Sequence, residues 1–524
     1  MDPSAWPSSA VSPYRAGYTP AERRKIETRL ARGDLLAVVS TSALELGIDI
    51  GALDLCLLVG YPGTRIATHQ RAGRVGRRQR TSAVILIAGE DALDAYFLKH
   101  PNQLWHGETE RAVLNPHNPR ILAQHLVCAA VERPLDTAET WLRLPAVTAV
   151  VDSLVAEGRL RRRADAAILL SIEKRPHRHV HLRTEGRPLP ILDASDGHLI
   201  VEIDQLRAPR DTHPGALYLH RGTTYLIETL DLAAGKVTAR PQRVGYTTRA
   251  RTRGQTQIVS LEAEKETPGT TISFGKLQVE DQVIGYERIR RSDGRKLGMT
   301  DLDLPPQVFE TEGLWFCVAT SLLSELDRQG VDLMGALHAA EHLLIALFPL
   351  LVLADRNDVG GLSTNYHPQT DRATIFIYDG IPGGAGLCRE AFGRFTALVR
   401  QAIATADTCQ CDTGCPACVH SPKCGSGNEP LDKGGAQRLL EGLLNPTHFD
   451  SGKRLNLAAP PPGGAPSRGH PPCPTAFSTS KPSVRQRRSA VGGMPNAWAS
   501  AAPCFTKARA TPSASTGRMR SIGS

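Results

Sequence analysis

The sequence has no apolar run long enough to cross a bilayer. Its longest apolar stretch, Leu343 to Ala354, is too short for the hydrocarbon core and contains Pro349. The first residues, Met1 to Pro13, are rich in Pro and Ser and lack the apolar centre of a signal peptide. We therefore expect no membrane partner, a cytoplasmic location, and disorder over residues 1–13.

Acidic residues are missing from one long stretch. The chain has 62 Lys and Arg against 53 Asp and Glu, a formal net charge of +9. Residues 451–524 hold eleven of the basic residues and no acidic one, so 62 less eleven leaves 51 basic against 53 acidic residues in the rest. The overall charge therefore says nothing about the nucleic-acid affinity of the folded part, which has to be judged from local clusters. Residues 445–524, rich in Pro, Ala, Ser and Gly, are expected to form a disordered basic tail.

The order of the predicted elements indicates an α/β multidomain protein, and 524 residues suffice for three or four separate cores. Apolar strand patterns that alternate with helical ones predict a parallel sheet near the N-terminus. The expected domains are a partial α/β domain over 14–114, a winged-helix-like domain over 115–188, a β-rich domain folded as a small β-barrel over 189–305, and an α/β domain over 306–444.

Two polar segments follow strands of the predicted parallel sheet. STSALELGIDI occupies residues 40–50, and QRAGRVGR occupies residues 70–77. Ligands of such sheets bind beyond the carboxyl ends of the strands. The guanidiniums of Arg74 and Arg77 fork onto phosphate oxygens, and the glycines between them allow tight turns. A solvated basic helix start is the simpler interpretation, but the position after the strands favours phosphate binding.

These two segments resemble motifs V and VI of the superfamily 2 helicases, on the second RecA-like domain. With YRAGYTPAERRKIE and GYPGT, they resemble the DEAD/DEAH-box DNA helicases of the MrfA/YprA and Hrq type. The resemblance implies a partial RecA-like sheet, ATP with Mg²⁺ as cofactor, and DNA as partner. It also implies that Arg74 and Arg77 reach the γ-phosphate, with Arg77 as the arginine finger, and that Gln70 contacts the nucleotide.

The same resemblance implies roles for four residues of the earlier segment. Gly47 and Asp49 would couple the nucleotide to the cleft between the two RecA-like domains. Ser40 and Thr41 would donate their hydroxyls to the DNA backbone. A turn carboxylate for Asp49 and an ordinary strand end for Thr41 are the simpler interpretations.

The phosphate-cradling motif GxxxxGK[ST] and the DExx motif are absent from the sequence. The nearest match, Gly269 to Lys276, has five residues between its glycines and is followed by Leu277. Helicases of this type carry both motifs on a first RecA-like domain. We therefore expect the C-terminal half of a helicase, inactive alone, whose partner is the missing N-terminal half if that half is encoded separately.

A short basic segment follows the predicted helices of the second domain. Residues 120–132 and 145–157 have the periodicity of amphipathic helices, and Gly158 is expected to end the second. Arg161, Arg162 and Arg163 come next. On the strands of a winged helix they would contact DNA phosphates, although a solvated charge run explains them equally well.

Five of the eleven cysteines lie within residues 409–424, in CQCDTGCPACVHSPKC. In a cytoplasmic protein such clustering favours zinc over disulfides, and the spacing closes a tetrahedral site locally. We predict structural Zn held by Cys409, Cys411, Cys415 and Cys418, with Cys424 as the reserve ligand. With IYDGIPGGAGLCREAF and CGSGNEPLDK, the segment resembles the zinc-binding C-terminal domain of the MrfA-type helicases.

One further pattern, His338-Ala339-Ala340-Glu341-His342, matches the H-x-x-E-H signature of some metalloproteases. It lies on an apolar helical stretch, Leu333 to Leu347, where the two histidines share a face. No third ligand is evident from the sequence, so core and surface histidines are the better interpretation.

The leading hypothesis is the C-terminal portion of an ATP-dependent DNA helicase. The family would make it a three-prime to five-prime translocase with a DNA-repair role, and the sequence leaves the oligomeric state open. The alternative is a non-catalytic zinc and winged-helix DNA-binding or scaffold module derived from a helicase.

Overall fold

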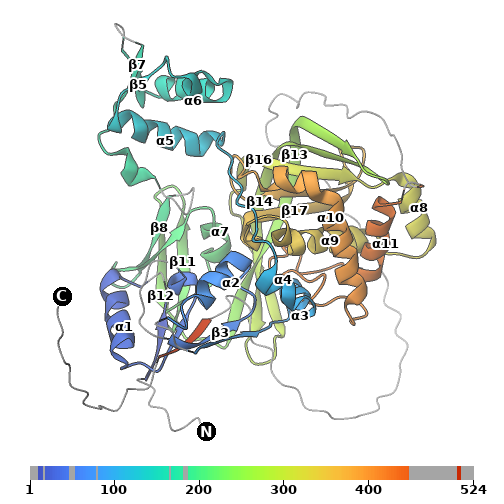
Figure 1. Ribbon diagram of the computed structural model, residues 1–524, viewed down its shortest axis with the longest axis horizontal. Coiled ribbons are helices and arrows are strands. Elements are labelled where there is room, and N and C mark those ends of the chain that lie inside the picture. The colour runs from blue at the N-terminus through green and yellow to red at the C-terminus, as the bar shows by residue number, and fades with distance from the viewer. Residues whose placement is uncertain are drawn as a thin grey trace, which may run out of the picture.

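The computed structural model describes residues 10–15, 18–45, 53–77, 81–163, 167–180, 187–445, 447 and 504–508. The predicted site residues Gly47 and Asp49 lie outside these ranges. In the described chain, helices and four sheets alternate along the sequence (Figure 1).

The N-terminal sheet contains the strands expected for the parallel sheet and one more, β1 (Val11–Tyr14), which begins within residues 1–13; the expectation of disorder there is wrong for Val11 to Pro13, because they pair with the next strand. β1 pairs with β2 in parallel, and β3 pairs with β4 in parallel. The predicted parallel sheet is mixed, however, because β19 runs antiparallel to both β2 and β3 and lies between them. This strand comes from the stretch expected to form no regular structure, and it is the red arrow beside β3 in Figure 1. In spatial order the strands are β1 (Val11–Tyr14), β2 (Ala37–Ser40), β19 (Cys504–Ala508), β3 (Leu53–Val59) and β4 (Ala83–Ile87).

The first helix, α1 (Pro20–Arg32), packs against this sheet, and residues at both of its ends carry the sequence signals of a helix start and a helix stop. Thr19 and Glu22 form a capping box, in which each side chain accepts from the other residue's backbone N–H at 3.3 and 2.9 Å. Gly33, with φ of 83°, ends the helix in the left-handed region. Leu30 is 5% exposed and packs in the core of the sheet.

The winged-helix part has its own core and lies apart from the rest at one end of the molecule (Figure 1). Leu126 and Val127 of its first helix pack against Val151 and Leu154 of its second. Gly158 has φ of 72°, as its predicted role at the helix end requires. The elements are α5 (Pro119–Glu132), β5 (Leu135–Asp136), α6 (Pro145–Ala156), β6 (Leu160–Arg162) and β7 (Ile168–Ser171), with sheet order β5-β7-β6.

A five-stranded sheet follows, in the order β10-β11-β12-β8-β9. Arg221 and Gly222 form the hairpin turn between Leu217–His220 and Thr223–Asp231, and both have the positive φ, 52° and 82°, that such a two-residue turn requires. The pairings of the described residues form a single row, without the closure of the expected small β-barrel. The elements are β8 (Pro188–Asp193), β9 (Leu199–Asp204), α7 (Ala208–Asp211), β10 (Leu217–His220), β11 (Thr223–Asp231) and β12 (Lys236–Pro241).

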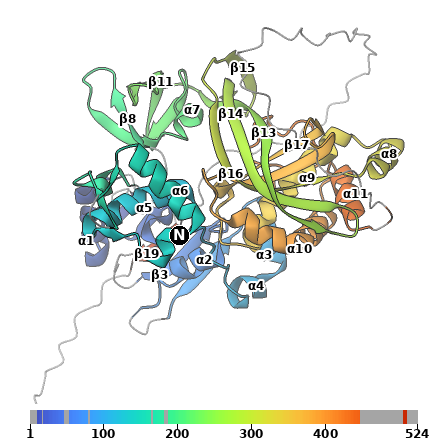
Figure 2. The ribbon, with the colours of Figure 1, turned by 90° about the horizontal axis from the view of Figure 1, so that it is seen from above.

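The largest sheet has the order β13-β14-β16-β18-β17, with β15 paired to β14. Its ladder runs across the expected boundary at residue 305, because β14 pairs with β16 from Ile272–Phe316 to Asp281–Gln307. Figure 2 shows the long β13–β14 hairpin lying over α9 and α10. The strands are β13 (Tyr246–Glu266), β14 (Thr271–Arg290), β15 (Lys296–Asp301), β16 (Gln307–Cys317), β17 (Val359–His367) and β18 (Arg372–Asp379).

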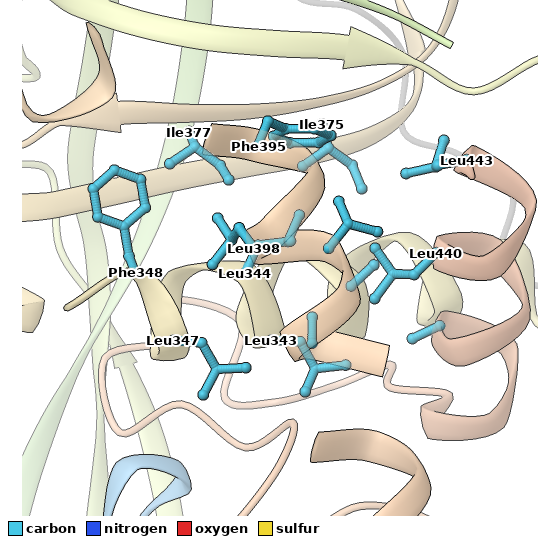
Figure 3. Close-up of a cluster of buried hydrophobic side chains, with 14 of the residues drawn as sticks. Leu343, Leu344, Leu347, Phe348, Ile375, Ile377, Phe395, Leu398, Leu440 and Leu443 are labelled. Carbon is cyan, nitrogen blue, oxygen red and sulfur yellow. The ribbon is translucent and has the colours of Figure 1, made fainter. Parts of the chain in front are cut away.

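Helices on one face of this sheet form the main core. Leu343 and Leu344 pack with Leu398 and Leu440 from two neighbouring helices, and all four side chains are at most 1% exposed (Figure 3). Contrary to the expectation from the sequence, one described helix, Leu333–Leu350, could cross a membrane by length and composition alone, but 72% of it is buried inside the protein, as in a core helix. The helices are α8 (Thr320–Arg328), α9 (Leu333–Leu347), α10 (Leu387–Thr408) and α11 (Lys433–Leu443).

Candidate functional sites

The arginine segment begins on a short helix after β3. Thr64 caps α2 (Arg65–Ala72) by accepting from the Ala67 N–H at 3.0 Å. Beyond the helix, Gly76 has φ of 73° and donates its N–H to the Leu53 carbonyl at 3.1 Å. This hydrogen bond holds the backbone of the segment against Leu53, the first residue of β3.

The structure brings the two predicted polar segments together. Nε of Arg71 lies 3.0 Å from the Glu45 carboxylate, and the Arg74 guanidinium donates to the backbone carbonyl of the same residue. The Arg71 and Glu45 side chains are only 11% and 16% exposed, so solvent weakens this pair little. Arg77 and Gln70 are half-buried, and Nε of Arg77 donates to the Gly73 carbonyl at 3.4 Å.

The two hydroxyls of the earlier segment differ in exposure. Ser40, the last residue of β2, is 1% exposed, and its hydroxyl donates to the Thr41 carbonyl at 2.9 Å. Thr41 is exposed. Of the two, Thr41 alone is accessible to a ligand in this conformation.

The predicted DNA-contacting arginines lie on the wing, the name used below for β6, β7 and the residues between them that the structure describes. Arg161 and Arg162 end β6, Arg163 follows it, and all three are exposed. Arg162 lies 2.6 Å from Asp152 of α6, in a pair whose side chains are 50% and 60% exposed. Such an exposed pair contributes roughly 0–1 kcal/mol and opens easily for a phosphate.

Buried carboxylates that the sequence did not single out connect the arginine helix to the rest of the molecule. Glu110 is 6% exposed and accepts from the Arg65 N–H at 2.6 Å and from the Ile66 N–H at 3.2 Å. Asp94 of α3 (Ala92–Lys99) accepts from the Tyr61 N–H at 2.6 Å. These bonds fix the start of α2 against α3 and α4 (Pro101–His106).

The other end of α3 reaches the cysteine loop. Lys99 donates from Nζ to the carbonyl of Thr408 at 2.9 Å, and Thr408 directly precedes Cys409. Tyr61, Leu93 and Phe97 also belong to the same apolar core as α9 and α10. The arginine segment and the cysteine loop are thus joined by continuous packing.

The four predicted zinc ligands converge. The sulfur of Cys409 lies 3.5 Å from those of Cys411 and Cys415, and Cys418 lies 3.5 and 3.8 Å from Cys411 and Cys415. Four sulfurs around one zinc at about 2.3 Å are separated by about 3.8 Å, so the observed set fits a closed tetrahedral site. Cys424 is not among them.

The surroundings of Cys409, Cys415 and Cys418 favour ionisation unevenly. Burial raises the pKa of Cys418 and raises that of Cys415 to about 11. Burial also opposes ionisation of Cys409, but the Cys411 N–H and the neighbouring thiols bring the pKa of Cys409 down to about 7. Lys433, 8% exposed, donates to the carbonyls of Cys409 and Cys411 at 2.7 and 2.6 Å and places positive charge beside the site.

Cys424, the predicted reserve ligand, lies with the two histidines of α9 instead. Its sulfur is 3.3 Å from Nε2 of His338. Burial opposes ionisation of Cys424, but hydrogen bonds from His338, His342 and neighbouring groups lower its pKa to about 4. Glu341, between the histidines in sequence, is buried and accepts from the Ser363 hydroxyl at 2.6 Å. That position leaves the carboxyl enclosed, unlike the water-activating Glu of a metalloprotease cleft.

A fully buried carboxylate shapes the glycine-rich turn before α10. Asp379 accepts from the N–H groups of Ala385, Gly386, Leu387 and Cys388 at 2.7 to 3.1 Å. It thereby satisfies the first N–H groups of α10 and fixes the turn. The run of glycines after Asp379 was the available sequence signal for such close backbone approach.

Comparisons with known proteins agree with this arrangement. The helicase conserved C-terminal domain family matches residues 6–79, the winged-helix domain of the ATP-dependent helicase HRQ1 matches residues 114–185, and the MrfA Zn-binding domain matches residues 340–419. The three matches follow the order of the sheet with the arginine segment, the winged helix and the cysteine-bearing part.

Relatives and solved structures extend the likeness along the chain. The chain is 34% identical over 418 residues to the uncharacterized ATP-dependent helicase YprA of Bacillus subtilis, covering 79% of this chain and 55% of the relative. It is 30% identical to the ATP-dependent helicase hrq1 of Schizosaccharomyces pombe, covering 83% of this chain and 42% of the relative. The chain therefore spans about half the length of these curated relatives.

Among solved structures, the helicase MrfA bound to DNA matches with a TM-score of 0.53 and 32% identity, covering 83% of this chain and 57% of that chain. The same helicase bound to DNA and AMPPNP matches with a TM-score of 0.51 and 32% identity, covering 82% of this chain and 56% of that chain. This chain therefore belongs to the MrfA/YprA-like superfamily 2 helicases and corresponds to a C-terminal part of such a protein.

Proposed function

We propose that this chain supplies the second half of the ATP site and part of the DNA path of an ATP-dependent DNA helicase. The observation that carries the proposal is the meeting of the two polar segments at Glu45, which binds Arg71 through its carboxylate and Arg74 through its carbonyl. This contact holds the arginine segment against the strand edge where a phosphate ligand of such a sheet binds.

Arg74 and Arg77 would act on a nucleotide held by another domain. ATP with Mg²⁺ would be bound by a domain with the GxxxxGK[ST] and DExx motifs, which this sequence lacks. In our proposal Arg77 offers its guanidinium to the charge that develops on the γ-phosphate, a contribution worth roughly 10³–10⁵ in rate for arginine fingers. Gln70, Gly47 and Asp49 keep their proposed roles around the nucleotide.

DNA would be bound by the wing and by the strand edge. The exposed guanidiniums of Arg161, Arg162 and Arg163 suit sequence-independent phosphate contacts. Thr41 is accessible for a backbone contact, whereas Ser40 would need a change of side-chain environment. The solved structures of MrfA with DNA support DNA as the partner. The proposal also includes translocation in the three-prime to five-prime direction, a role in DNA repair and a cytoplasmic location.

Zinc would be structural and held by Cys409, Cys411, Cys415 and Cys418. The sulfur separations of 3.5 to 3.8 Å fit the ion, and four thiolates leave no position for a reactive water. The ion would fix the loop between α10 and α11.

One observation favours a second candidate function. Without the two phosphate motifs in its sequence, the chain could serve as a non-catalytic DNA-binding or scaffold module. The two candidate functions are distinguished by combining this chain with a first RecA-like domain. That domain can come from a neighbouring reading frame or from the Bacillus relative. DNA-dependent ATP hydrolysis by the combination supports the helicase, while DNA binding without hydrolysis in every combination supports the module.

A further inference from the structure

A second cluster of metal-ligating side chains lies outside the four cysteines. His338 and His342 are one turn apart on α9, and Cys424 meets them from the loop after the tetrad. One ligand atom from each, the ring nitrogens and the sulfur, lies within 4.8 Å of the other two. We propose that these three side chains form a second zinc site, distinct from the cysteine tetrad.

The orientation of both imidazoles is fixed in the form that a metal requires. Nδ1 of His338 lies 2.8 Å from the Pro430 carbonyl, and Nδ1 of His342 lies 2.7 Å from the Val419 carbonyl. Because a carbonyl oxygen only accepts, each Nδ1 carries a proton, and each Nε2 is the atom that offers a lone pair to an ion once any proton on it has been displaced. A ligating histidine with its other ring nitrogen bonded to a backbone carbonyl is the usual arrangement around protein-bound metals.

The loop that carries Cys424 is held in shape by its own hydrogen bonds. The Asn428 amide accepts from the Ser421 N–H at 2.8 Å and donates to the Ser421 carbonyl at 3.0 Å. The Asn428 N–H in turn donates to the Cys424 sulfur at 3.2 Å. Arg251 of β13 donates to the carbonyl of the next residue, Gly425, at 3.3 Å. The sulfur is thus positioned before any ion binds, which lowers the entropy lost on binding.

The ligand types and spacing select zinc. Nε2 of His338 and Sγ of Cys424 are 3.3 Å apart, near the ~3.5 Å edge of a tetrahedron with Zn–S of about 2.3 Å and Zn–N of about 2.0 Å. Imidazole and thiolate together suit zinc better than the hard cations, which take oxygen ligands.

The enclosure of the cluster points to a structural role. His338, His342 and Cys424 are 9%, 6% and 9% exposed. The Ser426 hydroxyl lies 3.1 Å from the Cys424 sulfur and adds to the polar contacts that enclose it. Since His342 also bonds the carbonyl next to Cys418, the second ion would clamp α9 to the same loop that the tetrad shapes.

The test is a metal count on the folded full chain, prepared with excess zinc and then freed of loosely bound ions. We expect two zinc ions per chain in the wild type and one in Cys424→Ser, with the remaining ion lost only when Cys411→Ser and Cys415→Ser are added. Cys128→Ser is the matched control, since this cysteine lies on α5 away from both clusters, and it should retain two ions.

Cobalt substitution in the wild type gives a reading that does not depend on the folding of a variant. The absorption bands of Co²⁺ differ between a site with four thiolate ligands and a site with one thiolate and imidazoles. Two Co²⁺ ions per chain, one of each kind, support the proposal. One zinc or cobalt ion per chain in the wild type overturns it and leaves His338 and Cys424 as a hydrogen-bonded pair. Failure of the helicase proposal would leave this result unchanged, because the count needs neither ATP nor DNA.

Discussion

Arg71 and Glu45 form an enclosed ion pair, with Nε of the guanidinium 3.0 Å from the carboxylate. Glu45 is the last described residue of the first polar segment, and Arg71 lies in the second. The pair therefore ties together two stretches that adjoin a phosphate ligand in our proposal. Its loss should disturb the positions of the arginines more than the fold.

We predict that Glu45→Ala lowers the kcat of ATP hydrolysis about tenfold or more in a complex with a first RecA-like domain. Arg71 would lose its carboxylate partner, while the backbone carbonyl that Arg74 contacts remains, and an arginine segment displaced by about 1 Å loses much of its effect on the transition state. Steady-state kinetics separate this fall in kcat from a change in the KM for ATP. Glu139→Ala removes a comparable pair with Arg133 whose arginine is 80% exposed, and it should leave kcat unchanged. Equal kcat values for both variants would contradict the positioning role.

Zinc removal should destabilise the part of the protein around α9, α10 and α11. Replacing Cys411 and Cys415 by Ser removes two of four ligands, and structural zinc contributes directly to folding, with apparent binding of roughly 10–16 kcal/mol in small zinc domains. We expect a lower melting temperature and the loss of one zinc ion per chain. Thermal unfolding and metal analysis on the same sample check this, with Cys128→Ser as the control. A melting temperature equal to that of the wild type would argue against structural zinc in the tetrad.

Replacing the three arginines of the wing by neutral residues should weaken DNA binding and make the binding constant less dependent on salt. Arg161→Gln, Arg162→Gln and Arg163→Gln together remove up to three phosphate contacts, which should reduce the slope of log K against log salt by roughly 0.7–0.9 for each contact. Fluorescence anisotropy with a labelled duplex at several salt concentrations measures the slope. Arg328→Gln with Arg438→Gln, on the exposed surfaces of α8 and α11, is the control. An unchanged slope in the triple variant would mean that DNA does not reach the wing.

One histidine should make the stability of the protein depend on pH. His213 is 1% exposed and stacks on Tyr286 at 4.7 Å between ring centroids. Burial lowers the pKa of His213 below its ordinary value of 6.5, and only the Pro214 carbonyl and Asp211 oppose this. The unfolded chain therefore binds more protons than the folded one just below pH 6.5. The stability that the neutral imidazole contributes is complete above that pH and is lost as pH falls toward the lowered pKa of His213.

His213→Phe keeps an aromatic ring against Tyr286 and removes the titrating group, so it should flatten this dependence. Urea unfolding at a series of pH values between neutral and mildly acidic gives the slopes. His177→Phe replaces an exposed histidine and should leave the slope of the wild type in place. A His213→Phe slope as steep as that of the wild type would assign the pH dependence to other groups.

Local signals in the sequence predicted those elements whose causes are local. Thr19, Pro20 and Gly33 are local sequence signals for the two ends of α1, and Arg221-Gly222 is a local signal for a hairpin, because capping and turn formation depend on neighbouring residues. The four zinc ligands could also be predicted from the sequence, since they lie within ten residues of one another. The motif segments were identified by resemblance, and their contact at Glu45 emerged only from the structure.

The remaining features depend on distant parts of the chain. The long β13–β14 hairpin was not predicted, because register shifts at three places interrupt its alternation of side chains. Strand β19 enters the N-terminal sheet from more than 440 residues away, and no local pattern specifies its antiparallel direction. Cys424 meets His338 across 86 residues, so their pairing required the packing of α9 against the loop.

The proposed function is tested most sharply by DNA-stimulated ATP hydrolysis of this chain combined with a first RecA-like domain, with and without Arg77→Ala. We predict turnover in the wild-type combination, and a fall on the order of 10³-fold or more in the variant, with zinc content and DNA affinity unchanged. Turnover retained in the Arg77→Ala combination would contradict the assignment of Arg77 as the residue that completes the ATP site.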